Sequence, residues 1–203
     1  MTFNMKDWIR NIMGSEKRVP MPIMTYPGLA LSGRSIPDVI RNGEDQFSCI
    51  YALSQKYPSA AAMTIMDLSV EAEAFGSPIR YSDNEVPTVA GSIIFDEKSA
   101  RELKIPRIGT GRTGAYLKAA ALCAQHINDR PSFGGHIGPF SLACRLYDMT
   151  ELMVALFDEP DTVHMILGKA TEFLVSYAKA FKGSGAAGII IAEPAAGLLA
   201  PEQ

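Results

Sequence analysis

Few cysteines, few histidines and no excess of basic residues are found in this sequence, and each shortage disfavours a class of protein. Its 203 residues include three cysteines and three histidines, and 22 acidic against 19 basic residues give a net charge of -3 at pH 7. Without a basic stripe, nucleic acid is not an expected partner. The thiols Cys49, Cys123 and Cys144 are odd in number and far apart, which indicates neither a disulfide framework nor a CxxC metal site. We expect them to be buried thiols on helices.

Long hydrophobic runs are also missing. No run approaches the roughly 20 apolar residues that span a bilayer, and the opening MTFNMKDWIRNIMG is amphipathic and charged, unlike a signal peptide. We therefore expect a protein of the cytoplasm. The hydrophobic fraction of 47% is that of an ordinary globular chain with a buried core.

The chain alternates short apolar runs with segments of helical periodicity. We predict helices within residues 34–58, 113–128, 140–146, 151–157 and 160–182, and a loop-rich insertion at 81–103. The apolar runs predict strands near 21–26, 60–67, 133–137 and 188–192. Because these runs are uniformly apolar and separated by helices, they predict an α/β fold with a parallel sheet.

Polar side chains and glycines stand where the predicted strands end. Side chains at the carboxyl ends of parallel strands converge on the ligand site of such folds. The residues at these ends are Tyr26, Asp67, His136, Gly138 and Glu193. We expect them to face one cavity, with Tyr26 on its rim.

Several motifs, in a fixed order, resemble a known family. They are PIM near the start, TIMD before a helix that leads to FG, then GGHIGPFSLA, DEPDTV and GAAGIIIAEPAAGLLAPEQ. This order is similar to the amino-terminal half of the uroporphyrinogen decarboxylase superfamily, and in particular to its corrinoid-dependent methyltransferase branch of the methylcobamide:coenzyme M type. The resemblance covers about residues 20–203. It implies a (β/α)8 barrel of the TIM type, with residues 1–203 forming about the first half of a single barrel domain.

The resemblance implies roles for the strand-end residues, and each role has a structural alternative. The GGHIGPF loop would line the cleft for a flat tetrapyrrole or corrinoid, or it is a tight strand-to-helix turn in which His136 satisfies local hydrogen bonds. Asp67 matches an aspartate that accepts hydrogen bonds from pyrrole nitrogens, or it caps the next helix through the amides of Ser69 and Val70. Glu193 is a ligand of substrate or of the metal shell, or a structural residue before Pro194.

Two departures from the family pattern distinguish its branches. The decarboxylases use arginine near the first strand to bind substrate carboxylates, and here only Arg34 stands nearby. The methyltransferases bind zinc through His-x-Cys and a later Cys, and no His-x-Cys occurs in this sequence. We expect methyl transfer from a methylated corrinoid or corrinoid protein to a thiol in the full-length protein, with tetrapyrrole decarboxylation as the alternative. We expect no zinc site and no activity in this chain alone.

Half a barrel has open strand edges, which something must cover. We therefore expect a fragment of a longer protein, or a half-barrel that pairs with a second half-chain or with its own copy. If the chain is complete as written, the contrasting hypothesis is a non-catalytic half-barrel that binds a partner or self-associates.

Overall fold

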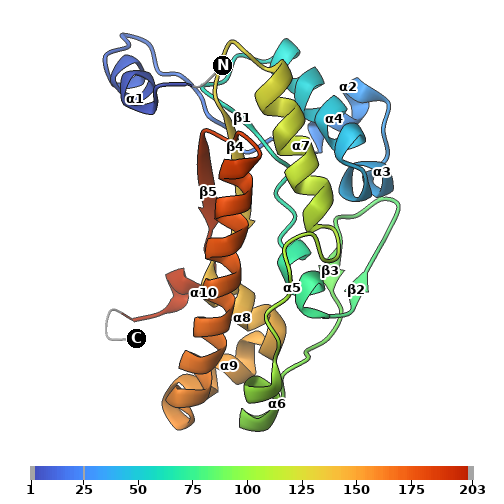
Figure 1. Ribbon diagram of the computed structural model, residues 1–203, viewed down its shortest axis with the longest axis vertical. Helices are drawn as coiled ribbons and strands as arrows, with labels where there is room; N and C mark the ends of the chain where they lie inside the picture. Colours follow the sequence, from blue (N-terminus) through green and yellow to red (C-terminus); the bar gives the residue numbers. More distant parts are fainter. Residues whose placement is uncertain (1–2, 25, 201–203) are drawn as a thin grey trace. The chain divides into compact units, whose positions relative to one another are not determined.

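The computed structural model describes residues 3–24 and 26–200 (Figure 1). Helices dominate and the strands are short. The elements in chain order are α1 (Met5–Met13), α2 (Pro27–Ser32), α3 (Ile36–Arg41), α4 (Gly43–Lys56), β1 (Ala62–Met63), α5 (Val70–Phe75), β2 (Ile79–Arg80), β3 (Thr88–Val89), α6 (Glu97–Glu102), α7 (Thr113–His126), β4 (Ser132–Ile137), α8 (Pro139–Tyr147), α9 (Met149–Asp158), α10 (Pro160–Gly183), β5 (Gly188–Ala192) and the 3₁₀ turn η1 (Ala196–Leu198).

The chain forms two compact units, which are described separately. The first unit comprises Met1–Met66, Gly114–Gly135 and Ala178–Ile190. The second unit comprises Asp67–Thr113, His136–Tyr177 and Ile191–Gln203.

The main sheet is parallel, as the sequence predicts, with the strand order β1-β4-β5. Strand β1 pairs with β4 in parallel register, with Ala62 opposite Ser132. Two backbone hydrogen bonds join the segments of β4 and β5. The amide of Ala187 donates to the carbonyl of Ser132 at 2.8 Å, and the amide of Gly138 donates to the carbonyl of Ala192 at 2.7 Å. Both contacts advance in the same direction along the two strands, so β5 is parallel to β4.

The predicted strand at 21–26 is wrong over its described part. Residues 21–24 have no regular structure, residue 25 lies outside the described residues, and Tyr26 is the N-cap of α2 with φ -77° and ψ -20°. The carbonyl of Pro20 accepts one hydrogen bond from the amide of Ala60 at 2.8 Å. Prolines have no amide hydrogen to donate, so Pro20 and Pro22 limit this segment to isolated contacts.

The predicted strand at 60–67 is much shorter in the structure, because β1 covers only two residues. Beyond it, the amide of Thr64 still donates to the carbonyl of Phe133 at 3.0 Å, but the amide of Gly135 donates to the Thr64 hydroxyl, Oγ1, at 2.9 Å. A side chain thus takes the place of a backbone partner. Asp67 lies beyond this point, in the loop before α5.

The predicted loop-rich insertion at 81–103 contains some regular structure. Its residues Thr88 and Val89 form β3, which pairs antiparallel with β2. Its last part forms α6, where Asp96 and Ser99 make a capping box. The sequence analysis did not predict these elements, and such a short ladder has no hydrophobic period long enough to recognise.

Helix caps explain why the predicted helical segment at 34–58 is two helices. Ser35 and Asp38 form a capping box at the start of α3. Asn42 ends α3 with extended backbone, and its side-chain oxygen accepts from the amides of Glu44 and Asp45 to begin α4. One asparagine therefore both stops a helix and starts the next.

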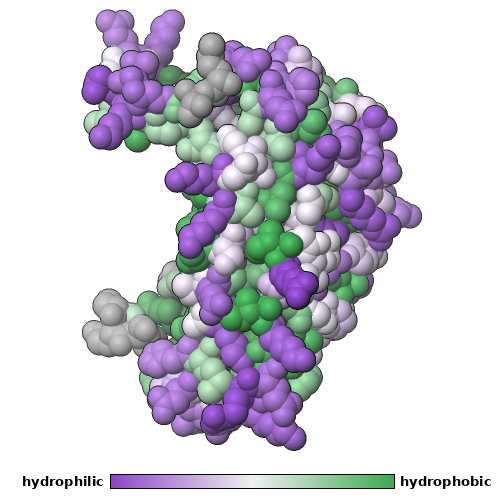
Figure 2. Space-filling view, viewed as in Figure 1, coloured by the Kyte–Doolittle hydropathy of each residue, from purple (hydrophilic) through white to green (hydrophobic). Residues whose placement is uncertain are grey.

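Hydrophobic packing in the first unit includes α1, which precedes the region that carries the family resemblance. Trp8 meets Phe133 edge-on, with ring centroids 5.5 Å apart, and its indole nitrogen donates to the carbonyl of Ala60 at 3.1 Å. Met5 and Trp8 pack against the buried cluster of Ala61, Met63 and Phe133. The outward side of the α1 region is largely hydrophilic (upper left in Figure 2).

The three cysteines are free and buried, as predicted. Cys49 lies on α4, Cys123 on α7 and Cys144 on α8. Burial raises the pKa of Cys49 to about 11, that of Cys123 to about 12 and that of Cys144 to about 11. These thiols are therefore protonated side chains of the hydrophobic interior at neutral pH.

The core of the second unit forms around α10, which the apolar stripe of residues 160–182 predicts correctly. Phe173 is fully buried, and its ring lies 5.2 Å from that of Phe75 on α5 and 5.9 Å from that of Tyr177. Lys169 reaches α6, where its ammonium donates to the carbonyls of Ala100, Arg101 and Leu103 at 2.7, 2.7 and 2.8 Å. Aromatic contacts and this lysine hold α5 and α6 to α10.

Candidate functional site

Asp67 lies at the centre of a buried polar network in the second unit. Its side chain is 1% exposed and forms an ion pair with Arg112. Its other oxygen, Oδ1, accepts from the amide of Ser69 at 3.0 Å and from the Ser69 hydroxyl at 2.6 Å. The Ser69 amide was one of the two capping contacts that the sequence suggested. The amide of Val70, the other predicted contact, donates to the backbone carbonyl of Asp67 at 3.4 Å, and Ser69 is the N-cap residue of α5. One of the two side-chain contacts of the structural alternative is thus present, with a buried arginine added to it.

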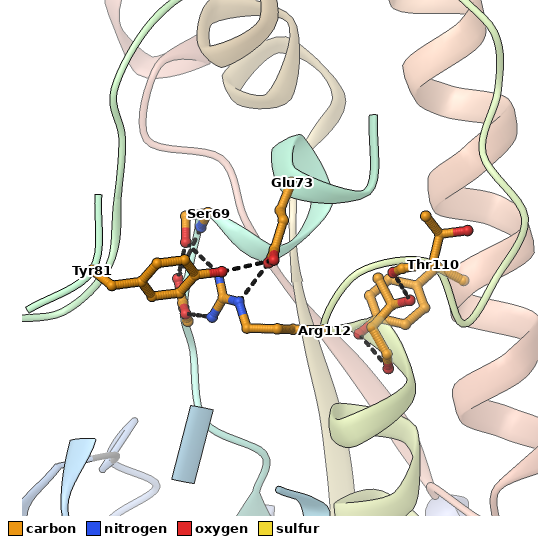
Figure 3. A network of polar contacts seen from close by, with 8 residues as sticks. Ser69, Glu73, Tyr81, Thr110 and Arg112 are labelled. Atoms are coloured by element: carbon orange, nitrogen blue, oxygen red, sulfur yellow. Dashed lines mark hydrogen bonds and ion pairs between the residues drawn. The ribbon is translucent and has the colours of Figure 1, made fainter. Parts of the chain in front are cut away.

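Arg112 connects Asp67 to α5 and to Tyr81, the residue that follows β2. Its Nη2 donates to the Ser69 hydroxyl at 2.8 Å, and its Nε donates to Glu73 at 2.5 Å. The hydroxyl of Tyr81 donates to the other oxygen of Glu73 at 2.7 Å, and the Tyr81 ring lies 5.3 Å from the guanidinium carbon. Figure 3 shows Glu73 and Tyr81 converging on this guanidinium. Two carboxylates and an aromatic face thus hold one buried cation.

A glycine-rich turn places Arg112 in this interior. Gly109 and Gly111 both have positive φ, at 99° and 57°. The Thr113 hydroxyl donates to the carbonyl of Thr110 at 2.6 Å and accepts from the amide of Gly109 at 3.0 Å. The sequence GTGRTG is a signal for this turn, because glycine readily adopts a left-handed backbone. The two glycines set the direction of Arg112, which lies between Gly111 and the start of α7.

Glu71 and His136 bind the two backbone groups of Ile137, the last residue of β4. The amide of Ile137 donates to Glu71 Oε1 at 3.4 Å, and Nδ1 of His136 lies 2.6 Å from the carbonyl oxygen of Ile137. Glu71 and His136 are 2% and 4% exposed. Since β1 ends far short of this point, side chains bond the backbone where a neighbouring strand does not.

Burial controls the ionisation of both side chains. Desolvation raises the pKa of Glu71 to about 8, despite the hydrogen bond from Ile137 and the nearby Arg112. Desolvation also lowers the pKa of His136. Both groups are therefore mainly neutral near pH 7.

His136 lies against α10. Its ring centroid is 6.2 Å from that of Tyr177. Because a carbonyl oxygen only accepts, the contact with Ile137 places the ring hydrogen on Nδ1. This is the local hydrogen bonding that the sequence analysis gave as the alternative to a ligand role.

Gly138 and Glu193 come together at the start of α8. Gly138 is the N-cap residue, and Glu193 accepts from the amides of Phe140 at 3.0 Å and Ser141 at 2.7 Å. A Cβ at Gly138 would overlap the carboxyl group of Glu193. The carboxylate therefore caps α8 from a distant segment, at the positive end of the helix dipole.

An apolar groove adjoins this cap in the second unit. It has a volume of about 760 Å³, and Glu193 is among its lining residues. Its walls also come from the start of α8, the end of α9, the first half of α10, β5 and η1, through residues such as Phe140, Phe157, Leu167 and Ile191. Figure 2 shows hydrophobic residues at the lower left of the view, in the region of η1. Asp67 and His136 do not line this groove.

The predicted cleft residues thus have separate surroundings in the described structure. Gly138 and Glu193 are in contact, and Asp67 and His136 each have partners of their own. Tyr26 belongs to the first unit, where it precedes α2. Their shared cavity stays a prediction.

The described residues do not fit the zinc that the sequence resemblance implies. Among residues 3–24 and 26–200, no three histidine, cysteine or acidic side chains group so as to hold a metal ion. The thiols lie on three different helices and burial raises their pKa values, whereas zinc requires a thiolate. We assign no chemical step in this chain to a metal.

In the part of the chain that the structure describes, no helix has both the length and the apolar character required to cross a bilayer.

The family model for uroporphyrinogen decarboxylase (URO-D) matches residues 20–203. The chain belongs to this family, and the resemblance seen in the sequence is confirmed. Among curated relatives, it is 29% identical over 185 residues to the methylcobamide:CoM methyltransferase MtbA of Methanosarcina mazei, covering 88% of this chain and 54% of the relative. It is 32% identical over 174 residues to the protein of the same name from Methanosarcina acetivorans, covering 85% and 51%.

Decarboxylases are also similar to the chain. The uroporphyrinogen decarboxylase of Xylella fastidiosa is 24% identical over 154 residues, covering 72% of this chain and 43% of the relative. A solved methyltransferase from Methanosarcina mazei superimposes with a TM-score of 0.85 at 24% identity, covering 98% of this chain and 62% of that one. At this identity the likeness shows the fold. The chain spans about half the length of the curated relatives it matches.

Proposed function

We propose that this chain is part of a methyltransferase that moves a methyl group from a methylated corrinoid to a thiol or a similar acceptor. The observation that carries the proposal is the identity of 29% and 32% to two methylcobamide:CoM methyltransferases, against 23% to 25% to the uroporphyrinogen decarboxylases. Within this proposal, residues 1–203 form about the first half of a single (β/α)8 barrel. The 203-residue chain alone is expected to be inactive.

The surroundings of the arginines support methyl transfer over decarboxylation. Decarboxylation of a porphyrinogen with several carboxylates needs guanidinium groups that can reach the substrate. Arg34, the candidate near the start, forms an ion pair with Asp45 at 3.1 Å in the first unit. Arg112 is buried in its own network in the second unit. Each of these two arginines therefore already has a carboxylate partner within the chain.

The proposed reaction transfers CH₃⁺ from cobalt to sulfur. The thiol loses its proton, the thiolate attacks the methyl carbon, the cobalt–carbon bond breaks, and its electron pair stays on cobalt, which passes from Co(III) to Co(I). The products are a thioether, Co(I) corrinoid and a proton. We propose a corrinoid protein as the partner and the cytoplasm as the location.

For the predicted cleft residues, the contacts favour a positioning role. Asp67 would orient the loop after β1 through Ser69 and Arg112. Glu193 would fix the Gly138 turn at the edge of the cleft. His136 and Tyr26 remain proposed cleft residues whose contacts with substrate are untested.

A test uses the full-length protein with methylcobalamin and 2-mercaptoethanesulfonate. Loss of the methylcobalamin absorbance together with formation of the methyl thioether, followed by mass spectrometry, is the expected result. A parallel reaction contains uroporphyrinogen and no thiol, and release of carbon dioxide with no methyl transfer would replace our proposal by the decarboxylase alternative. If neither reaction proceeds with either substrate, the non-catalytic half-barrel becomes the better interpretation.

The role of Asp67 needs two measurements on the same variant. Asp67→Ala should reduce methyl transfer more than its effect on the melting temperature explains. The structural cost of the substitution includes about 0.5 to 2 kcal/mol for a local cap and about 3 to 5 kcal/mol for breaking the buried ion pair with Arg112. The loss of activity is therefore compared with this larger loss of stability. Unchanged transfer with a lowered melting temperature would show that Asp67 is only structural.

A further inference from the structure

Glu71 is a buried carboxyl group that the proposed reaction does not use. It lies in the first turn of α5, is 2% exposed, and has one oxygen, Oε2, without a hydrogen-bond partner among the described residues. Its other oxygen accepts the amide of Ile137. A buried carboxylate with an unsatisfied oxygen is costly, so the group is stable there in its protonated form.

His136 contacts the carbonyl group of Ile137, the same residue whose amide donates to Glu71. Its Nδ1 donates to the carbonyl of Ile137, while its Nε2 is buried without a partner in the described structure. The end of β4 is therefore held by one acidic and one basic side chain, both mainly neutral near pH 7. A ladder bond to a neighbouring strand contains no titratable group, whereas each of these two contacts contains one, and the charged form of each side chain is unfavourable in this buried position.

Charged groups from several segments surround Glu71. Asp67, in the loop after β1, raises the pKa of Glu71 by repulsion, and Arg112, in the loop before α7, lowers it. On α10, burial raises the pKa of the Tyr177 phenol, and the charge of nearby Glu71 raises it further. Helix α8 also packs against α5 and carries Arg145 as its charged residue. Because Arg112 already binds Asp67 and Glu73, it does not neutralise a third nearby carboxylate, that of Glu71, in full.

Ile137 immediately precedes the turn that begins α8. The amide of Gly138 donates to Ala192, and Gly138 leaves room for Glu193. A loosened Ile137 would therefore loosen the turn at the carboxyl end of β4. We propose that Glu71 is a proton-controlled latch: with its proton it holds the end of β4, and on losing the proton it leaves the interior and frees the strand end with its glycine turn. The proposal does not depend on which reaction the whole protein catalyses.

Hydrogen exchange on the full-length protein tests the latch. The peptide covering residues 132–140 is followed by mass spectrometry from about pH 5.5 to about pH 9, and each rate is divided by the intrinsic rate at the same pH. If opening requires loss of one proton, protection of this peptide should fall about tenfold per pH unit up to about pH 8 and then level off. Glu71→Gln keeps an oxygen for the Ile137 amide and removes the titration of Glu71, so its protection should not change with pH above about pH 6.5, where His136 is neutral.

Two controls separate the latch from general loosening. Glu102→Gln removes a carboxyl group from the exposed end of α6 and should behave as the wild type. If Glu71→Gln does not fold, infrared spectra of wild-type protein with ¹³C-labelled glutamate report the protonated carboxyl directly, and its band should disappear above about pH 8. Equal pH dependence in the wild type and Glu71→Gln, or no protonated carboxyl band at neutral pH, would overturn the proposal.

Discussion

Glu193 packs over Gly138, so the missing side chain of the glycine makes room for the carboxyl group that caps α8. The two residues lie at the ends of β4 and β5, which are adjacent in the sheet. The sequence analysis selected both as strand-end residues. Their contact was not predicted, because the two residues are far apart in the chain.

Gly138→Ala should displace Glu193 and weaken both of its hydrogen bonds to α8. We expect a loss of about 1 to 3 kcal/mol in the free energy of unfolding, measured by urea titration. Gly168→Ala is the matched control, because a Cβ there meets no atom within 4 Å. Gly168 lies inside α10, so the control should be neutral or stabilising by up to about 1 kcal/mol. Equal effects of the two substitutions would contradict the close packing of Gly138 and Glu193.

Arg112→Met should be among the more damaging single substitutions in the second unit. Removing the cation leaves Asp67 buried without its ion pair, and breaking a buried pair costs about 3 to 5 kcal/mol. Adding Asp67→Asn to this variant should restore part of the stability, since the uncompensated charge is then gone. Arg101→Met, at an exposed ion pair with Glu97, should change the free energy of unfolding by less than about 1 kcal/mol. A double variant less stable than Arg112→Met would contradict the assigned pairing.

The free energy of unfolding should fall as pH rises through the range in which Glu71 is ionised in the unfolded chain and protonated in the folded chain. Its pKa rises on folding from 4.5 to about 8. The folded state therefore holds a proton that the unfolded state has lost, and the free energy of unfolding falls with rising pH by roughly 1 kcal/mol per pH unit in this window. Glu71→Gln should remove this contribution. Chemical denaturation at a series of pH values measures it, and a wild type whose slope matches that of Glu71→Gln would contradict it.

His136 should act in the opposite direction at lower pH. Burial lowers its pKa below 6.5, so the unfolded state binds a proton more readily, and stability from this group is lost as pH falls below 6.5. The two groups then offset one another below about pH 6.5. His136→Asn keeps a donor for the Ile137 carbonyl and removes the titration, so it should make the decline due to Glu71 visible at lower pH. A pH profile identical to the wild type would exclude this role of His136.

Lys169→Met should release α6 from α10. The ammonium group donates to the carbonyls of Ala100, Arg101 and Leu103 at the end of α6, and the substitution leaves these groups without their donor. Hydrogen exchange of the peptide covering residues 96–104 should accelerate, with a global loss of about 1 to 3 kcal/mol. Lys179→Met, on an exposed part of α10, should leave this peptide unchanged. Faster exchange throughout the molecule instead of at α6 would argue for a general packing defect.

Helices and the parallel sheet were predictable because their signals are local. The apolar stripe of α10 and the uniformly apolar run of β5 identify each element without knowledge of its neighbours. The extents of the first strands were overestimated, since hydrophobicity indicates burial and does not show where a ladder stops. Pro22 and Thr64 mark the positions where backbone pairing gives way to other contacts.

Most of the polar network was hidden from sequence reasoning. Arg112 meets Asp67 across 45 positions of the chain, so nothing local connects them. Glu71 and Glu73 did carry a usable signal. Residues two apart on a helix point in nearly opposite directions, so both glutamates cannot lie on one solvent-facing side of α5. One of them had to face the interior, and the structure shows that it is Glu71.

Helix α1 lies outside the segment that matches the family, yet its Trp8 covers Phe133 in the core of the first unit. The family match therefore begins later in the chain than the residues that pack against the core of the first unit. A version trimmed to begin at Pro20 would keep every residue of the family match and uncover the hydrophobic cluster at Ala61, Met63 and Phe133. Loss of solubility in such a version would reflect a missing cover and would say nothing about the stability of the shared fold.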